Sequence, residues 1–104
     1  MIRIVNDGKL SCPTFFCDWC EQPIEDAGRA LYMWDMEKEI EGERPEPYIA
    51  HKRCHRDIEE RWIDGTLGTM ELQVLPFFLL ANSGIEGREA HEKALRLSAM
   101  MGMI

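Results

Sequence analysis

The 104-residue chain carries two short pairs of residues that can bind a metal ion. The first pair is Cys17 and Cys20, and the second is His51 and Cys54. In each pair the two side chains stand three positions apart, so both can reach one ion. Together they supply three thiolates and one imidazole, a complete set of ligands for a tetrahedral zinc ion. The spacing therefore predicts one Zn²⁺ per chain, bound in a closed site.

Two other kinds of chemistry compete with this interpretation. Cys17 and Cys20 alone have the spacing of a redox-active dithiol, which makes a thiol-based redox or zinc sensor an alternative, although it leaves His51 and Cys54 without a role. A catalytic zinc keeps three protein ligands and one open position, whereas four ligands are present here. We therefore expect a structural metal and a protein that is not an enzyme.

Two further residues of suitable type lie close by. Cys12 stands five positions before Cys17, which is the wrong spacing for a metal-binding turn. We interpret it as a small buried residue or as one without a role in the metal site. His55 follows Cys54 directly and would point away from the metal on a helix. We expect this histidine to face the solvent or to form a hydrogen bond with one of the metal ligands.

The elements that position the first pair begin at the N-terminus. Residues 1–6 alternate loosely between apolar and polar side chains, and Asp7-Gly8 is a strong turn signal. A second strand is expected over residues 10–16, with Pro13 marking it as an edge strand or an interrupted one. The chain then enters a tight turn over residues 17–22, whose backbone amides point at the thiolates.

The second pair follows a stretch of strand-forming residues. Residues 30–36 and 47–50 predict two strands, and the glutamate-rich segment 37–46 predicts a solvated hairpin tip between them. Cys54, Ile58 and Trp62 recur every four residues, which indicates a helix over residues 51–64 that ends at Gly65. His51 and Cys54 are thus expected on the first turn of that helix.

This order of elements, a metal-binding turn, a hairpin and a helix with the second ligand pair, resembles the treble-clef zinc fingers. Within them it is similar to a single LIM-like half over residues 16–62. The matching residues are Cys17, Cys20, Pro23, Ile24, His51 and Cys54. The chain departs from that pattern in its long interval between the pairs, in Glu21 where such turns often have glycine, and in lacking a second ligand set. The resemblance implies a fold and a metal, but no particular partner.

The segment after Gly65 is apolar and ambiguous. Met70, Leu72 and Val74 alternate with polar residues as in a strand, yet residues 66–82 also suit a helix kinked at Pro76. We favour a helix because of the length of the segment.

A final helix is predicted near the C-terminus. Ser83 and Glu86 form a capping box, and the helix is expected to reach Met101 and to stop at Gly102. An apolar stripe runs along it, formed by Ala90, Ala94, Leu97 and Met101. The stripe needs a partner surface, either the preceding apolar segment or a second copy of the chain.

These elements predict an α+β fold, namely a small antiparallel sheet with a treble-clef zinc finger plus two C-terminal helices. Residues 1–65 would form the zinc-binding module, and residues 66–104 a helical extension that packs on it or on a second chain. A module of this size with few apolar residues buries little surface. Structural zinc can supply on the order of 10 kcal/mol or more, so the metal is expected to decide whether the module folds.

Charge bears on the choice of partner. The formal net charge of −7 opposes binding to phosphate backbones. The cluster of Lys52, Arg53 and Arg56 keeps a nucleic-acid-binding zinc finger as the alternative, but we interpret these cations as screening the thiolates. The favoured function is a zinc-stabilised interaction or assembly module that binds another protein, with a homodimer through the C-terminal helix as one form.

The longest apolar run has eight residues and includes Pro76, so no membrane association is expected. A soluble, cytoplasmic protein is predicted, because paired cysteines at metal spacing suit a reducing compartment. The aromatic residues Trp19, Tyr32, Trp34 and Trp62 are expected to cover the zinc and not to bind a ligand.

Overall fold

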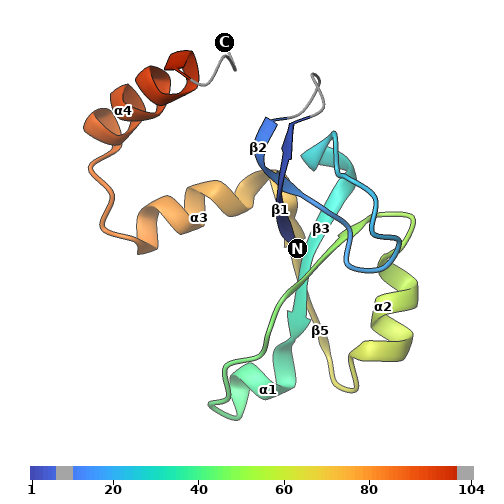
Figure 1. The fold of residues 1–104 in the computed structure, drawn as a ribbon. Helices are drawn as coiled ribbons and strands as arrows, with labels where there is room; N and C mark the ends of the chain where they lie inside the picture. The colour runs from blue at the N-terminus through green and yellow to red at the C-terminus, as the bar shows by residue number, and fades with distance from the viewer. Residues whose placement is uncertain (7–10, 101–104) are drawn as a thin grey trace.

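The computed structural model describes residues 1–6 and 11–100. For residues 6, 11 and 12 it describes the backbone but not the side chains. The predicted Asp7-Gly8 turn, the stop at Gly102 and the side chain of Cys12 therefore lie outside the described part. Within it, two antiparallel sheets and four α-helices form a mixed fold, which confirms the predicted α+β class (Figure 1). None of the helices in the described segments is long and apolar enough to span a membrane.

The strands are β1 (Ile2–Asn6), β2 (Ser11–Phe15), β3 (Ala30–Asp35), β4 (Tyr48–His51) and β5 (Leu67–Glu71). The α-helices are α1 (Met36–Ile40), α2 (His55–Trp62), α3 (Leu75–Asn82) and α4 (Gly87–Met100). Two short 3₁₀ helices, η1 (Ala27–Arg29) and η2 (Leu72–Val74), precede β3 and α3.

The first sheet is the predicted N-terminal hairpin. β1 pairs with β2 so that Ile2 faces Phe15 and Ile4 faces Pro13. Pro13 is tolerated because this sheet has only two strands, each with an unpaired edge. The hairpin delivers the chain into Cys17, as expected.

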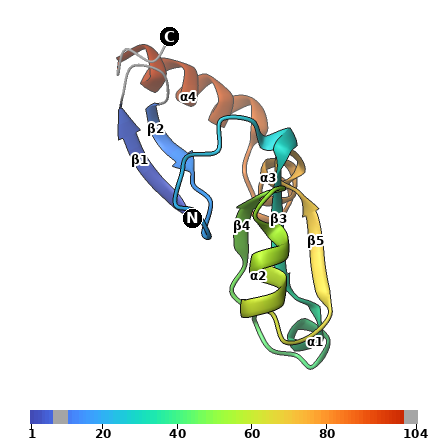
Figure 2. The same ribbon diagram turned by 90° about the vertical axis from the view of Figure 1, so that its right-hand side faces the viewer.

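The second sheet has the order β4-β3-β5 and forms the centre of the molecule. β3 pairs with β4 on one side, where Met33 faces Tyr48, and with β5 on the other, where Tyr32 faces Met70. Because side chains alternate along a strand, Met33 and Tyr32 point to opposite faces. Helix α2 covers the face of Tyr48, against which Trp62 packs (Figure 2).

The core lies around this sheet and around the turn that follows β2. Met33, Ile58 and Leu72 are fully buried large side chains from β3, α2 and η2. The other buried apolar residues are Cys17, Ile24, Ala30, Ile49, Ala50, Cys54, Ile63 and Leu75. Two of the four predicted metal ligands thus belong to the core.

The prediction of a helix throughout residues 66–82 is wrong for its first part. Leu67–Glu71 is a strand because β3 has an open edge that it completes, with Gly68 directly opposite Trp34. Helix α3 begins only at Leu75, and Pro76 stands in its first turn, where the missing N–H costs nothing. The alternation around Met70 was therefore the correct signal.

Two other boundaries differ from expectation. Helix α2 begins at His55, and His51 is the last residue of β4, so only Cys54 stands at the helix start. The glutamate-rich segment is exposed as predicted, but it contains helix α1. Asp35 caps α1 by accepting hydrogen bonds from the N–H groups of Glu37 and Lys38.

The two C-terminal helices lead away from the central sheet (Figure 1). Only the first residue of α3, Leu75, is buried, and no residue of α4 is buried. Three residues of the predicted apolar stripe, Ala90, Ala94 and Leu97, lie on α4. The fourth, Met101, lies outside the described residues. The division of the chain into residues 1–65 and 66–104 stays a prediction.

Candidate metal centre

The turn that carries Cys17 and Cys20 is closed by its own backbone. The N–H of Cys17 donates to the carbonyl of Gln22 (3.0 Å), and the N–H of Glu21 donates to the carbonyl of Cys17 (3.0 Å). Glu21 has a φ of 60°, a left-handed conformation that is easiest for glycine. The backbone N–H of Cys20 approaches the Sγ atom of Cys17 at 3.5 Å and so helps to neutralise a thiolate there.

Asp18 joins this turn to strand β4. Its N–H donates to the carbonyl of Ile49 (2.7 Å), and its carboxylate accepts the N–H of Ile49 (2.7 Å). The N-terminal ammonium group of Met1 lies 3.2 Å from the same carboxylate. Asp18 therefore holds the cysteine turn two residues from His51. Nothing in the spacing of the sequence singles out this role, because the bonds depend on how β4 lies against the turn.

His51 is oriented by both of its ring nitrogens. Its Nδ1 atom lies 3.4 Å from the Sγ atom of Cys20, and its Nε2 atom lies 3.3 Å from the carbonyl oxygen of Pro23. A carbonyl can only accept, so Nε2 carries the proton and donates to Pro23. The lone pair of neutral His51 is then on Nδ1, which faces the cysteines. Histidines that bind metals are commonly held in this way by a second partner.

Cys54 reaches the same place from the start of α2. Its N–H donates to the carbonyl of His51 (2.8 Å), which closes the turn between the two ligands. His55 donates from its ring Nδ1 to the carbonyl of Lys52 (2.7 Å) and so braces this turn without facing the cysteines. The first N–H groups of a helix carry partial positive charge, which favours a thiolate at Cys54.

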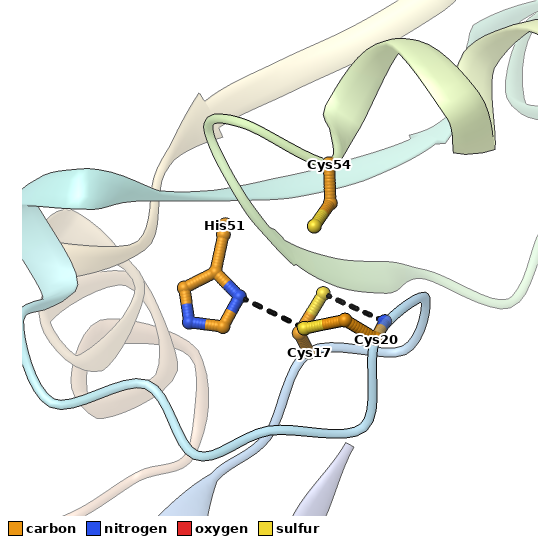
Figure 3. Close-up of side chains that lie close together, drawn as sticks. All are labelled: Cys17, Cys20, His51 and Cys54. Carbon is orange, nitrogen blue, oxygen red and sulfur yellow. Dashed lines mark hydrogen bonds between the residues drawn. The ribbon is translucent and has the colours of Figure 1, made fainter.

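The four predicted ligands come together in one cluster (Figure 3). Their ligand atoms all lie within 4.8 Å of one another, with Cys17 and Cys54 buried and Cys20 and His51 partly buried. In a tetrahedral zinc site, bonds of about 2.3 Å to sulfur and about 2.0–2.1 Å to nitrogen place neighbouring ligand atoms about 3.5–3.8 Å apart. The distance of 3.4 Å between Cys20 and His51 matches this closely. These four residues therefore suit a metal ion that prefers soft ligands.

The environment acts differently on two of the thiols. Burial, together with the neighbouring thiols of Cys17 and Cys20, raises the pKa of Cys54 to about 12. Burial also opposes ionisation of Cys20, but hydrogen bonds from the backbone of Gln22 and from other groups, including Arg53, lower its pKa overall. Three thiols packed together without a cation resist full ionisation, and a divalent ion would relieve that cost.

Only part of the expected aromatic cover lies beside this cluster. Trp62 packs against Trp19 of the cysteine turn and against Tyr48, with ring centroids 5.2 and 5.3 Å apart. Tyr32 and Trp34 instead pair with each other at 6.0 Å and line a groove that contains none of the four ligands. The prediction that all four aromatic residues cover the metal is therefore wrong for Tyr32 and Trp34, because alternation along β3 turns them to the other face.

The nearby cations are interleaved with carboxylates. Lys52 forms an ion pair with Glu71 (3.1 Å), and Arg29 pairs with Asp26 (3.6 Å). Arg29, Lys52 and Arg53 line a cavity of about 590 Å³ together with His51, Glu25 and Asp26. This surface carries both signs of charge.

No protein-family model, curated protein or solved structure matches this chain.

Proposed function

We propose that this protein is a small interaction module whose fold is stabilised by one structural Zn²⁺ ion. The observation that carries the proposal is the convergence of Cys17, Cys20, His51 and Cys54, whose ligand atoms all lie within 4.8 Å. Three thiolates and one imidazole favour zinc over the harder ions magnesium and calcium, which prefer oxygen. Four ligands close the coordination shell, so the metal has no open position for a substrate.

The arrangement of these ligands supports a treble-clef type of finger. One pair stands on a tight turn after a hairpin, and the other spans the end of β4 and the start of α2. The ion would tie the turn to the sheet and to helix α2 at a single point. In the described residues the fully buried large apolar side chains are few, so we expect this tie to supply much of the stability.

The interaction role is supported by helix α3. Its sequence is apolar on every side, and such helices are normally buried. Yet Phe77 is 71% exposed and Phe78 is 53% exposed, and Leu79 and Leu80 are about as open. Contiguous exposed apolar surface of this kind marks a site of protein contact. Helix α4 also exposes apolar side chains, those of Leu95 and Leu97.

We infer that a second copy of the chain covers α3 and α4, forming a homodimer. Light scattering should then give twice the chain mass of 12.1 kDa at micromolar concentration. Phe77→Glu should reduce the mass to that of one chain. Ile40→Glu is the matched control, because Ile40 is equally exposed on α1 and should leave the dimer intact. A monomeric wild-type protein would reject the homodimer.

Two alternative functions are nucleic-acid binding and thiol-based zinc sensing. Nucleic-acid binding through Lys52, Arg53 and Arg56 is disfavoured because Lys52 is already paired with Glu71. A thiol-based zinc sensor is favoured by one observation, the partial exposure of Cys20 together with its lowered pKa. One equivalent of a mild oxidant is added to the folded protein, without heating. Release of zinc under these conditions would support the sensor over a purely structural site.

A further inference from the structure

The face of the central sheet that α2 does not cover holds an aromatic groove. Tyr32 and Trp34 stand two residues apart on β3 and point to the same face, and Met70 faces Tyr32 from β5. These three side chains line a groove of about 340 Å³ together with Glu39, Glu43, Arg44, Pro45 and Pro47. The metal ligands are not among its lining residues.

Gly68 explains how Trp34 lies in this groove. Gly68 is the register partner of Trp34, and a Cβ atom on it would come within 2.6 Å of the indole Nε1 atom. The indole therefore rests across the backbone of β5, and its remaining surface is left to the groove. On the neighbouring position of the same face, the ring of Tyr32 is tilted by 49° to the indole, with centroids 6.0 Å apart. Both tilted rings line the groove.

The polar edge of the groove is acidic and partly engaged with the indole. Nε1 of Trp34 donates to the carboxylate of Glu39 at 2.6 Å, which fixes the ring and adds electron density to it. Glu43 also lines the groove, and no ion pair in the described segments uses it. Arg44 is the one cation among the lining residues. Within the described part of the chain, the cation–π contacts use the rings of Phe16 and Trp19 and none uses Tyr32 or Trp34.

We propose that this groove binds a lysine side chain, free or methylated, presented by a partner protein. A cation within about 6 Å of an aromatic centroid is attracted by the ring, most strongly by tryptophan, and the attraction rises when water is excluded. Two tilted rings with carboxylates beside them supply both the ring faces and the charge that such a ligand needs. The indole N–H is occupied by Glu39, which leaves the ring face as the binding element of Trp34.

A proline-rich partner is less well matched to the groove. Aromatic grooves for such segments use the polyproline conformation and hydrogen-bond donors toward its carbonyls. Here the indole donor is already taken by Glu39, and the negative charge of Glu43 adds nothing for a neutral ligand. The inference deepens the proposed interaction role and rests on it.

The test uses the zinc-loaded 104-residue chain and three capped pentapeptides with alanine on both sides of a central residue. That residue is lysine, trimethyllysine or norleucine, which has the same chain without the ammonium group. Binding is followed by ¹H–¹⁵N NMR through the Trp34 indole and the amides of Gly68 and Met70. The two cationic peptides should bind with dissociation constants in the millimolar range, and norleucine at least about fivefold more weakly, in line with a modest cation–π contribution.

Variants sharpen the outcome. Trp34→Leu should weaken the lysine peptide at least about fivefold, and Glu43→Gln about threefold, whereas removal of the competing cation by Arg44→Gln should strengthen binding. Glu41→Gln makes the same charge change on a residue that does not line the groove and should have a smaller effect. Equal binding of the norleucine peptide, or shifts confined to other surfaces, would overturn the proposal.

Two further measurements identify the type of ligand and separate the groove from the zinc site. Choline that binds more tightly than both cationic peptides would make the ligand a small molecule and would overturn the assignment to a partner protein. Zinc content is measured on the same sample, so a folded, zinc-loaded protein that binds no cation refutes only the groove. Loss of the structural zinc assignment would instead appear as a folded protein without metal.

Discussion

The Nε2 atom of His51 donates a hydrogen bond to the backbone carbonyl of Pro23 across 3.3 Å. This contact leaves the lone pair of Nδ1 available for a metal ion and turns that atom toward Cys20. It also ties the end of strand β4 to the residue that follows the cysteine turn. The same two segments are joined a second time by Asp18 and Ile49. The ligand set is thus held in place by hydrogen bonds as well as by any metal.

Replacing this histidine tests the separate roles of the ligand and of its orientation. His51→Cys should still bind one zinc, because four cysteines also form a structural site. The loss of the bond to Pro23 should lower the free energy of unfolding by about 1 kcal/mol. His51→Ala should lose tight metal binding. Zinc analysis and urea unfolding of both variants provide the measurement, and equal zinc affinity of His51→Ala and wild type would contradict the assigned ligand.

Cys54→Ser removes a ligand from a buried position. Cys54 is only 6% exposed, so the variant loses a metal bond and leaves a hydroxyl in the core. We expect a chain without stoichiometric zinc and without a cooperative thermal transition. Cys12→Ser is the control and should retain both, since Cys12 has the wrong spacing for the site. Circular dichroism together with zinc analysis distinguishes the outcomes, and a Cys12→Ser protein without zinc would require a different ligand set.

Glu21→Gly should stabilise the protein. Glu21 holds a φ of 60°, which costs a side-chain-bearing residue roughly 1 kcal/mol relative to glycine. Glu41→Gly is the control, because Glu41 has an ordinary φ of −73° and should lose roughly 0.5–1 kcal/mol instead. Opposite shifts of the thermal midpoint are expected. A destabilised Glu21→Gly protein would show that the carboxylate contributes more than the strained backbone costs.

Metal binding should release protons and strengthen as the pH rises. The Cys54 thiol is mostly protonated at pH 7.5 whether the metal-free chain is folded or unfolded, because burial and the two other cysteines raise its pKa to about 12 in the fold and a free thiol has a pKa of about 8.5. Zinc needs the thiolate and must displace that proton. Cys20 releases a smaller fraction of a proton, because its pKa is lowered. The apparent affinity should rise about tenfold per pH unit for each proton released. Calorimetry in two buffers of different ionisation enthalpy counts the protons, and a count of zero would contradict thiolate ligation.

Much of the metal centre was predictable because it depends on local spacing. The pairs Cys17–Cys20 and His51–Cys54 can be found in the sequence, and the resemblance to treble-clef turns marks position 21 as one where glycine is common. Asp18 was not predictable, since its bonds to Ile49 exist only once β4 lies against the cysteine turn. The sequence carries no signal for such a long-range contact.

The errors in the fold have similar causes. Residues 67–71 alternate over too few positions to exclude a helix, and the open edge of β3 decides in favour of a strand. Helix α1 had a usable signal, because Asp35 precedes Glu37 and Glu39 as a capping residue precedes a favourable first turn. The orientation of Trp34 needed the register of two strands, which places Gly68 beneath it.

In the proposed function, one bound zinc ion holds the fold together. The most direct measurement is metal analysis of the purified protein, followed by thermal unfolding with and without a strong chelator. We predict one zinc per chain and loss of the cooperative transition once the metal is removed, with recovery when zinc is added back. A metal-free protein with an unchanged thermal transition would contradict the account.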